Sequence, residues 1–453
     1  MDVFIARQPV FDRHKRLFAY ELLYRSGMDN AFPGDVDCDE ATHTVLAHIL
    51  FNIGLEALTG THRALINFPE NHLLQGTALQ LPNSRCIIEI LESIKPSEKI
   101  LAVCQELRDK GYLLALDDFD FNPSAEPFIP MAQIVKVDFR LIDQHHLADY
   151  MVRMRRYPKV SWLAEKIENH QEFALAESLG FSYFQGYFFN KPEIIKKRKI
   201  DTSKLVLLNL LAEVSRAEIN LARIEQLLAP DVSLAYKLLR YINSVYYSLV
   251  KKVTTIRYAL IYLGEHGTRQ FVSLAVASEL AEGKPTELMR LSMVRAELCR
   301  LLAESAKDGH EPSQLFLLGL FSLLDAMLDM PMSEVTAKLP LTGEVKDALD
   351  RGAGPFAPYL QSIIAYEQGD FSGCIDTLRV LDITPETMIS SYFRAVTWAD
   401  QTAARILLAC ICSASRIGQF SIRIACSSAG LVGSQCTTAA PQVMPAPKLL
   451  ITR

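Results

Sequence analysis

The strongest constraint on the fold is a regular alternation of short apolar runs and helix-length segments over roughly the first 190 residues. Segments such as PSEKILAVCQELRDKG, with apolar residues at helical spacing and a closing glycine, separate these runs. The apolar runs are LFAYELLYR, ALINF, CIIEIL, YLLALDDF, QIVKVDF, SWLAEKI and YFQGYFF. This alternation predicts parallel strands joined by crossover helices. Because the repeats are numerous and no glycine-rich dinucleotide turn occurs, an α/β barrel is favoured over an open sheet.

Polar residues interrupt or close these apolar runs, often near the C-terminal end. Run by run they are Glu21, Asn67, Glu89, Asp117 with Asp118, Lys136 with Asp138, Glu165 and Gln185. In a barrel of parallel strands those ends converge on one face, where active sites lie. A lone buried carboxylate usually anchors structure, but carboxylates from several strands would repel and raise each other's pKa. Divalent cations that prefer oxygen ligands, such as Mg²⁺ or Mn²⁺, would relieve that repulsion.

Two adjacent aspartates, Asp117 and Asp118, end the run YLLALDDF. Successive strand residues point to opposite sides, so this pair shares a site only where the strand ends and the backbone turns. There the pair could bridge and flank two metal ions about 4 Å apart, a spacing that suits cleavage of a phosphate ester. Lys136 would then neutralise phosphate or activate water.

From about Thr202 the apolar spacing becomes that of buried helices, as in DVSLAYKLLRYINSVYYS and SMVRAELCRLLAESAKD. The polar junction NKPEIIKKRKIDTSK contains a proline and predicts a linker. We therefore expect a barrel domain over 1–195, a linker over 196–204, an all-α domain over 205–400 and a tail over 401–453. The tail contains no Asp or Glu and is typical of a disordered or non-native extension, although its segment AARILLACI could instead extend a helix.

Composition excludes several classes of protein. The formal net charge of −5 argues against a nucleic-acid surface. No uninterrupted apolar stretch is long enough to span a membrane, and MDVFIARQPV lacks the features of a signal peptide. The cysteines before the tail are scattered, without CxxC pairs, which predicts reduced thiols in a cytoplasmic protein.

Together these motifs resemble the EAL-domain family of bacterial cyclic-di-GMP phosphodiesterases, coupled to an HDOD domain. The first resemblance covers roughly residues 2–195 and the second roughly 200–400. It implies a TIM-like (β/α) barrel followed by a helical HDOD domain, and hydrolysis of cyclic-di-GMP to the linear dinucleotide pGpG. The naming motif reads YELLYR, with Glu21 and Arg25 at matching positions and Leu22 in place of Ala.

The resemblance also implies roles for individual residues. The implied ligands of two Mg²⁺ or Mn²⁺ ions are Glu21, Asn67, Glu89, Asp117 and Asp118. The implied catalytic residues are Lys136, near the attacking water, and Glu165, a metal ligand or general base. The implied substrate contacts are Gln8, Arg25, Asp138 and Gln185, the last near the guanine. Glu92 would anchor the loop that follows the aspartate pair, and Glu168 would stand behind Glu165.

The chain departs from the family directly after Asp118. Active members usually continue with a glycine-rich FGTGYSS loop, whereas this chain reads FDFNPSAEPF, with Asp120 where a glycine would be. In the family that loop shapes the metal site and communicates with the dimer interface. The retained ligands favour an enzyme, which is our interpretation. The altered loop favours the alternative, a non-catalytic cyclic-di-GMP sensor or interaction scaffold, and a barrel phosphatase for another phosphoester is a third reading.

The helical half carries too few imidazoles for the metal centre of related phosphohydrolases. Only His266 and His310 lie between residues 201 and 400, and GLFSLLDAM places Ser322 and Leu323 where a His-Asp pair would stand. We therefore predict a regulatory or output domain that binds an unidentified protein partner, with His266 in a surface or capping role. The resemblance also implies a homodimer through the barrel.

Overall fold

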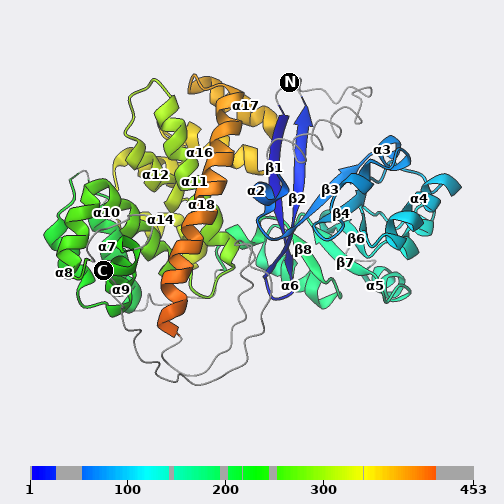
Figure 1. Cartoon of the computed structure of the whole chain (residues 1–453), viewed down its shortest axis with the longest axis horizontal. Helices are drawn as coiled ribbons and strands as arrows, with labels where there is room; N and C mark the ends of the chain where they lie inside the picture. Colours follow the sequence, from blue (N-terminus) through cyan, green and yellow to red (C-terminus); the bar gives the residue numbers. More distant parts are fainter. Residues whose placement is uncertain are drawn as a thin grey trace, which may run out of the picture. The chain divides into compact units, whose positions relative to one another are not determined.

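The computed structural model describes residues 3–26, 54–141, 147–193, 202–216, 218–243, 253–339 and 341–414. A strand-rich segment comes first, and from Thr202 the described residues form helices and their connections without strands (Figure 1). Contacts group the described residues up to Cys410 into one compact unit. In the described residues, no helix is both long and apolar enough to cross a membrane.

Within the described residues, the strands form one closed barrel in chain order, β1 to β8. They are β1 (Val3–Asp12), β2 (Leu17–Ser26), β3 (Arg63–Phe68), β4 (Cys86–Ile90), β5 (Leu113–Leu116), β6 (Ile134–Asp138), β7 (Ser161–Glu165) and β8 (Tyr183–Gln185). The predicted barrel is confirmed, and the neighbours from β2 to β8 are parallel.

Strand β1 was not predicted, and it runs antiparallel to both β2 and β8. The seven predicted runs are β2 to β8, whose parallel arrangement is confirmed, and β1 is an additional, antiparallel strand. The physical reason is the tight connection between β1 and β2, since only antiparallel strands can be joined by a short turn. Asp12 closes that turn: its Oδ1 accepts from the backbone N–H groups of His14 at 2.8 Å and Arg16 at 2.9 Å.

Short helices connect the strands of the barrel. They are α2 (Leu55–Thr59), α3 (Glu70–Leu74), α4 (Glu98–Asp109), α5 (Leu147–Arg155) and α6 (His170–Ser178), with 3₁₀ turns at Thr77–Gln80, Glu126–Met131, Phe139–Leu141 and Tyr187–Asn190. Helix α4 is the predicted PSEKILAVCQELRDKG helix, and the Ser97 hydroxyl caps it by accepting from the N–H of Ile100.

The second half consists of helices in its described residues. They are α7 (Thr202–Val214), α8 (Leu221–Leu228), α9 (Val232–Ile242), α10 (Ile256–Leu280), α11 (Thr286–Ser305), α12 (Pro312–Phe321), α13 (Leu324–Leu328), α14 (Met332–Thr336), α15 (Gly343–Arg351), α16 (Ala357–Glu367), α17 (Phe371–Val380) and α18 (Pro385–Ala414). Gly264 interrupts α10 with a φ of 67°, a left-handed conformation that glycine adopts readily. Gly319 lets α12 approach α11 closely, because a Cβ there would lie 2.3 Å from the carbonyl oxygen of Arg295.

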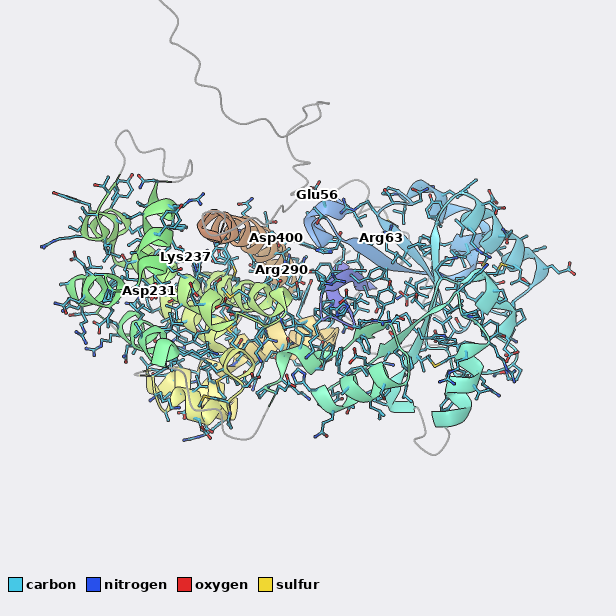
Figure 2. All side chains as sticks on the ribbon, turned by 90° about the horizontal axis from the view of Figure 1, so that it is seen from below. Glu56, Arg63, Asp231, Lys237, Arg290 and Asp400 are labelled. Atoms are coloured by element: carbon cyan, nitrogen blue, oxygen red, sulfur yellow. The ribbon has the colours of Figure 1, made fainter. Side chains whose placement is uncertain are left out.

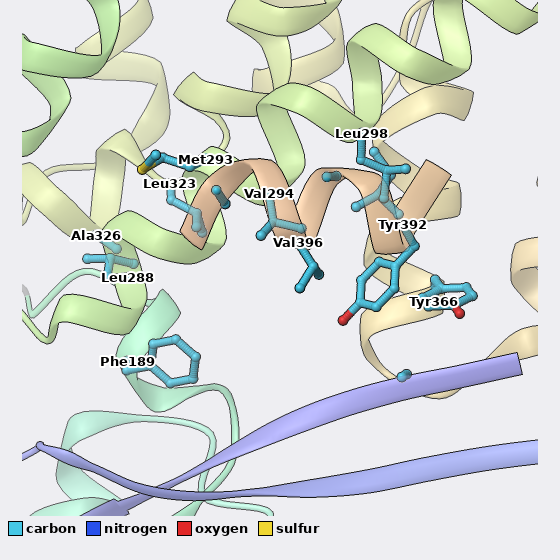
Figure 3. Close-up of a cluster of buried hydrophobic side chains, with 14 of the residues drawn as sticks. Phe189, Leu288, Met293, Val294, Leu298, Leu323, Ala326, Tyr366, Tyr392 and Val396 are labelled. Atoms are coloured by element: carbon cyan, nitrogen blue, oxygen red, sulfur yellow. The ribbon is translucent and has the colours of Figure 1, made fainter. Parts of the chain in front are cut away.

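Buried polar contacts join the barrel to these helices. The hydroxyl of Tyr20 in β2 donates to Oε2 of Glu287 in α11 at 2.7 Å. The hydroxyl of Tyr366 in α16 donates to the carbonyl oxygen of Ile5 in β1 at 2.9 Å. Figure 3 shows Tyr366 beside Tyr392 above the first strands. Helices α11 and α18 are themselves joined by Arg290 and Asp400 (Figure 2), whose ion pair has an N–O distance of 2.6 Å.

The predicted domain boundaries stay predictions. Residues 196–201, which are most of the predicted linker, and the tail after Ala414 lie outside the described residues. Helix α18 continues through AARILLACI, which agrees with the alternative reading of the start of the tail.

Candidate active site

The site is built by the alternation of side chains along each strand, in which every second residue points to the same side. Seven buried residues fill one layer of the barrel: Val10, Ala19, Leu65, Ile87, Ala115, Ile134 and Leu163. Alternate strand residues point to the same side, so the residue two positions further on lies in the next layer. From β2 to β7, that residue is in turn Glu21, Asn67, Glu89, Asp117, Lys136 and Glu165. In β1, which runs the other way, the corresponding residue is Gln8, two positions before Val10, and it pairs with Glu21. The sequence thus stacks a polar layer on an apolar one.

Lys136 lies at the centre of this polar layer. Its side chain is only 1% exposed, and its Nζ forms ion pairs with carboxylates from four other strands or strand ends. The distances are 2.8 Å to Asp117, 2.8 Å to Glu165 and 3.3 Å to Glu21, and the fourth partner is Glu89. An ammonium group has three protons to donate, so four carboxylates compete for one cation.

Burial and this shared lysine set the protonation of the site. Burial raises the pKa of Glu89 well above its usual value, and it raises the pKa of Glu165 to about 8, in both cases against the opposing charge of Lys136. Burial also works to raise the pKa of Asp117, but the charge of Lys136 and the hydrogen bonds to Asp117 together outweigh it and lower that pKa. Burial works to lower the pKa of Lys136, but its carboxylate partners raise it well above normal. The lysine therefore stays charged, and its single positive charge does not compensate all four carboxylates.

The donor set fits a divalent cation. Oxygens of Asp117, Asp118 and Glu165 lie within 4.8 Å of one another. Among the described residues, Oδ1 of Asn67 and Oε2 of Glu89 are buried without a hydrogen-bond partner. Unpaired buried acceptors are costly unless a cation or donor meets them, and carboxylate and amide oxygens suit hard divalent ions. The predicted ligand residues therefore match the chemistry of a divalent metal site.

A second charged group lies beside the first. Nζ of Lys166 donates to Oδ2 of Asp138 at 2.8 Å and to Oδ1 of Asp118 at 3.4 Å. Arg140 also donates to Asp138, and these two cations lower the pKa of Asp138 although its burial acts to raise that pKa. Two protein cations therefore hold the carboxylate of Asp138, and its contact with substrate stays a prediction.

Glutamine side chains connect the carboxylate of Glu21 to Tyr187 through a chain of hydrogen bonds. Nε2 of Gln185 donates to Oε2 of Glu21 at 2.6 Å and to Oε1 of Gln8 at 3.0 Å. Gln8 in turn reaches the hydroxyl of Tyr187 at 3.5 Å. Gly186 permits this arrangement, since its φ is 144° and a Cβ there would lie 2.1 Å from the carbonyl oxygen of Ile167.

The altered loop after Asp118 is anchored to the barrel. The N–H of Phe119 donates to the carbonyl oxygen of Lys136 at 2.8 Å. Phe121 stacks on Trp162 with ring centroids 5.8 Å apart, and Arg153 donates to the carbonyl oxygen of Phe121 at 2.8 Å. Asp118 has a φ of 37°, which marks the turn at the strand end. Aromatic packing therefore holds this loop where the family uses a glycine-rich one.

Three predicted residues stand apart from the central cluster. Glu92 is exposed and, among the described residues, has no bond to the loop that it was predicted to anchor. The loop is held instead by its own aromatic side chains. Glu168 is exposed at the rim and pairs with Lys191 at 3.7 Å. The side chain of Arg25 lies outside the described part of the chain.

The site opens into a pocket of about 360 Å³. It brings together the predicted residues Gln8, Glu21, Asp117, Asp118, Lys136, Glu165, Glu168 and Gln185. It also includes residues that the sequence analysis missed: Leu23, Arg140, Lys166, Ile167, Gly186, Tyr187 and Gln368. Lys166 and Arg140 closely follow the predicted residues Glu165 and Asp138 at strand ends. This position in the sequence could have identified them as site residues. Gln368 comes from α16, and no sequence pattern pointed to it.

Comparison with known proteins gives two domain matches. The EAL domain family model matches residues 41–192, and the HDOD domain family model matches residues 201–330.

Two curated proteins are similar over most of the chain. Cyclic di-GMP phosphodiesterase CdgJ of Vibrio cholerae serotype O1 is 37% identical over 397 residues, which cover 87% of this chain and 92% of that protein. The uncharacterized protein YuxH of Bacillus subtilis is 32% identical over 410 residues, 88% of this chain and 98% of that protein.

Among solved structures, the chain is similar to a standalone EAL protein from Vibrio cholerae O395 in its c-di-GMP-bound form. The identity is 25%, the TM-score is 0.33, and the match covers 41% of this chain and 90% of that one. It is also similar to Klebsiella pneumoniae BlrP1 in a calcium/cy-diGMP complex, with 22% identity, a TM-score of 0.35, and 41% and 55% of the two chains covered.

The fold and site define a (β/α) barrel protein with a carboxylate-rich centre at its strand ends, joined to a helical domain. The chain belongs to the family of EAL-domain proteins that carry an HDOD domain, which confirms the resemblance seen in the sequence.

Proposed function

We propose that this protein is a metal-dependent phosphodiesterase that hydrolyses cyclic-di-GMP to pGpG. The observation that carries the proposal is the polar layer at the strand ends, where four carboxylates share Lys136 beside unpaired oxygens of Asn67 and Glu89. The similarity to CdgJ, which is named a cyclic di-GMP phosphodiesterase, supports the choice of substrate.

Two divalent ions, Mg²⁺ or Mn²⁺, complete the proposed site. Their ligands would be Glu21, Asn67, Glu89, Asp117 and Asp118. When bound, such ions polarise a phosphoryl oxygen and lower the pKa of a coordinated water. The raised pKa values of Glu89 and Glu165 show that one lysine does not fully compensate four buried carboxylates, and bound cations would favour their ionised forms.

The residues of the chain supply the remaining steps. Glu165 accepts a proton from the attacking water, and Lys136, 2.8 Å from it, orients this carboxylate. Lys166 and Arg140 attract the phosphate, since both are cations that line the pocket. The water oxygen bonds to phosphorus, the bond from phosphorus to the ribose 3′ oxygen breaks, and that oxygen takes up a proton. The product is a linear dinucleotide with a 5′ phosphate.

The altered loop is the one observation that favours the alternative, a sensor that binds the nucleotide without turnover. Its anchoring argues for the enzyme, because the bond from Phe119 to Lys136 fixes the backbone directly after Asp118. The loop thus differs in sequence from the glycine-rich loop of the family, but the aspartate pair still lies at the end of β5.

Other predictions extend the proposal. The helical domain regulates the barrel or carries an output contact with a protein partner, and the barrel forms a homodimer. A cytoplasmic location accords with the buried free thiols of Cys86, Cys104, Cys299 and Cys374.

The test is product analysis of cyclic-di-GMP incubated with the full chain and Mn²⁺ or Mg²⁺, with Glu21→Ala alongside. The proposal predicts pGpG that depends on the metal and is lost in the variant. Tight binding without product would support the sensor instead. Turnover of aryl phosphates but not of cyclic dinucleotides would support a phosphatase of different specificity.

A further inference from the structure

A turn of the helical domain forms part of the wall of the active-site pocket. Helix α16 ends at Glu367, Gln368 follows as its C-cap, and Gly369 reverses the chain with a φ of 74°. The side chain of Gln368 is exposed and lines the same pocket as Asp117 and Lys136. The pocket is therefore bounded by both halves of the chain.

Contacts on both sides hold this turn in place. On the helical side, Arg295 of α11 donates to both oxygens of the Glu367 carboxylate, with Nε to Oε1 at 3.0 Å and Nη2 to Oε2 at 2.6 Å. On the barrel side, the hydroxyl of Tyr187 donates to the carbonyl oxygen of Glu367 at 3.1 Å. Tyr366 adds its bond to Ile5. Because Arg295 and Glu367 are buried, their charge-assisted pair fixes the end of α16 firmly.

The turn approaches the strand that carries the central glutamate. A Cβ on Gly369 would lie 3.3 Å from Cδ1 of Leu23, which follows Glu21 in β2 by two residues. The hydroxyl of Tyr187 connects the same turn to Gln8, and Gln8 connects it to Gln185. The turn is thus joined to the side of the pocket that the glutamines form.

The residues that line the pocket are of two chemical kinds. The charged residues are Glu21, Asp117, Asp118, Lys136, Arg140, Glu165, Lys166 and Glu168. The uncharged residues are Gln8, Leu23, Ile167, Gln185, Gly186, Tyr187 and Gln368. The cations and carboxylates suit the phosphate groups of a ligand. The apolar side chains and the amide groups suit a heterocyclic base.

We propose that the helical domain completes the substrate site, with Gln368 contacting a base of the cyclic dinucleotide and contributing to base specificity. This inference rests on the proposed function. A glutamine amide carries both donors and an acceptor, so it can pair with a base edge that presents both. A site that hydrogen-bonds a particular edge discriminates against a base that lacks it.

The test compares Gln368→Ala with Gln361→Ala in the full chain. Gln361 is a matched control: it is an exposed glutamine of the same helix, and its amide donates to the carbonyl oxygen of Gly352 at 2.8 Å, outside the pocket. We expect Gln368→Ala to raise KM for cyclic-di-GMP by about three- to tenfold, as loss of one hydrogen bond does, with kcat within about twofold. Its preference for cyclic-di-GMP over cyclic-di-AMP should fall, whereas Gln361→Ala should match the wild type.

The outcomes separate this inference from the proposed function. Wild-type turnover together with identical KM and base preference in both variants would overturn the inference alone. A wild type that neither binds nor cleaves cyclic-di-GMP would overturn both. If the wild type binds cyclic-di-GMP without cleaving it, the variants are compared by their dissociation constants instead. Gln368→Ala should then raise the dissociation constant by the same three- to tenfold factor.

Discussion

Replacing Lys136 with methionine should destabilise the metal-free protein strongly. The substitution keeps a long unbranched side chain and removes the charge that Glu21, Glu89, Asp117 and Glu165 share. Removing one partner from a buried ion pair costs about 3–5 kcal/mol, because the other charge is left unpaired. A domain of the size of the barrel loses about 2–4 °C in Tm per kcal/mol, so the expected drop is on the order of 10 °C.

The assay is thermal unfolding in a chelator and then with added Mg²⁺ or Mn²⁺. The cation should raise the Tm of Lys136→Met more than that of the wild type, since it meets carboxylates that have lost their lysine. Lys166→Met is the matched control: Lys166 is 41% exposed, so its pairs should contribute no more than about 1 kcal/mol. A Lys136→Met protein that melts within about 2 °C of the wild type in chelator would refute the reasoning.

Three further predictions concern other parts of the molecule. Burial raises the pKa of Glu287 to about 7 from 4.5, so the folded chain holds an extra proton between these values and loses stability as the pH rises through them. The charged and titratable groups facing it are Arg7, Tyr20, Arg290, Glu367 and Asp400. Denaturant unfolding of Glu287→Gln and of the wild type, at pH 5 and at pH 8, measures the difference in their free energies of unfolding. This difference should shift in favour of the variant by about 2–3 kcal/mol from pH 5 to pH 8. A difference that stays the same at both pH values would contradict the prediction. Gly319→Ala should lower the free energy of unfolding by about 1–3 kcal/mol through the clash with Arg295, whereas Gly343→Ala, with nothing within 4 Å, should not. Asp117→Asn should weaken divalent binding in calorimetry by at least about tenfold and abolish turnover, and unchanged affinity would exclude Asp117 as a ligand.

The sequence predicted the polar layer well because strand periodicity is local. Glu89 stands two residues after Ile87, and Lys136 two residues after Ile134, so the side that an apolar residue faces also fixes the side of the polar one. Closure of the barrel then brings the residues together without any further signal. Strand β1 was missed because its antiparallel direction depends on one short turn, which the strand–helix alternation does not encode.

Contacts between the two halves could not be predicted in the same way. Gln368 reaches the pocket because Arg295 and Tyr187 hold the end of α16, and both partners are distant in sequence. Likewise, the loop after Asp118 lacks the glycines of its family, yet packing of Phe121 on Trp162 anchors it. Such tertiary compensation is visible only once the chain is folded.

The most direct test of the central claim is a reaction with cyclic-di-GMP in water enriched in heavy oxygen, read by mass spectrometry. If water attacks phosphorus at the Asp117–Glu165 site, the full chain with Mn²⁺ or Mg²⁺ will produce pGpG with one heavy oxygen in its 5′ phosphate, and Glu21→Ala will not. Cyclic-di-GMP recovered unchanged, or product formed equally by Glu21→Ala, would contradict the account.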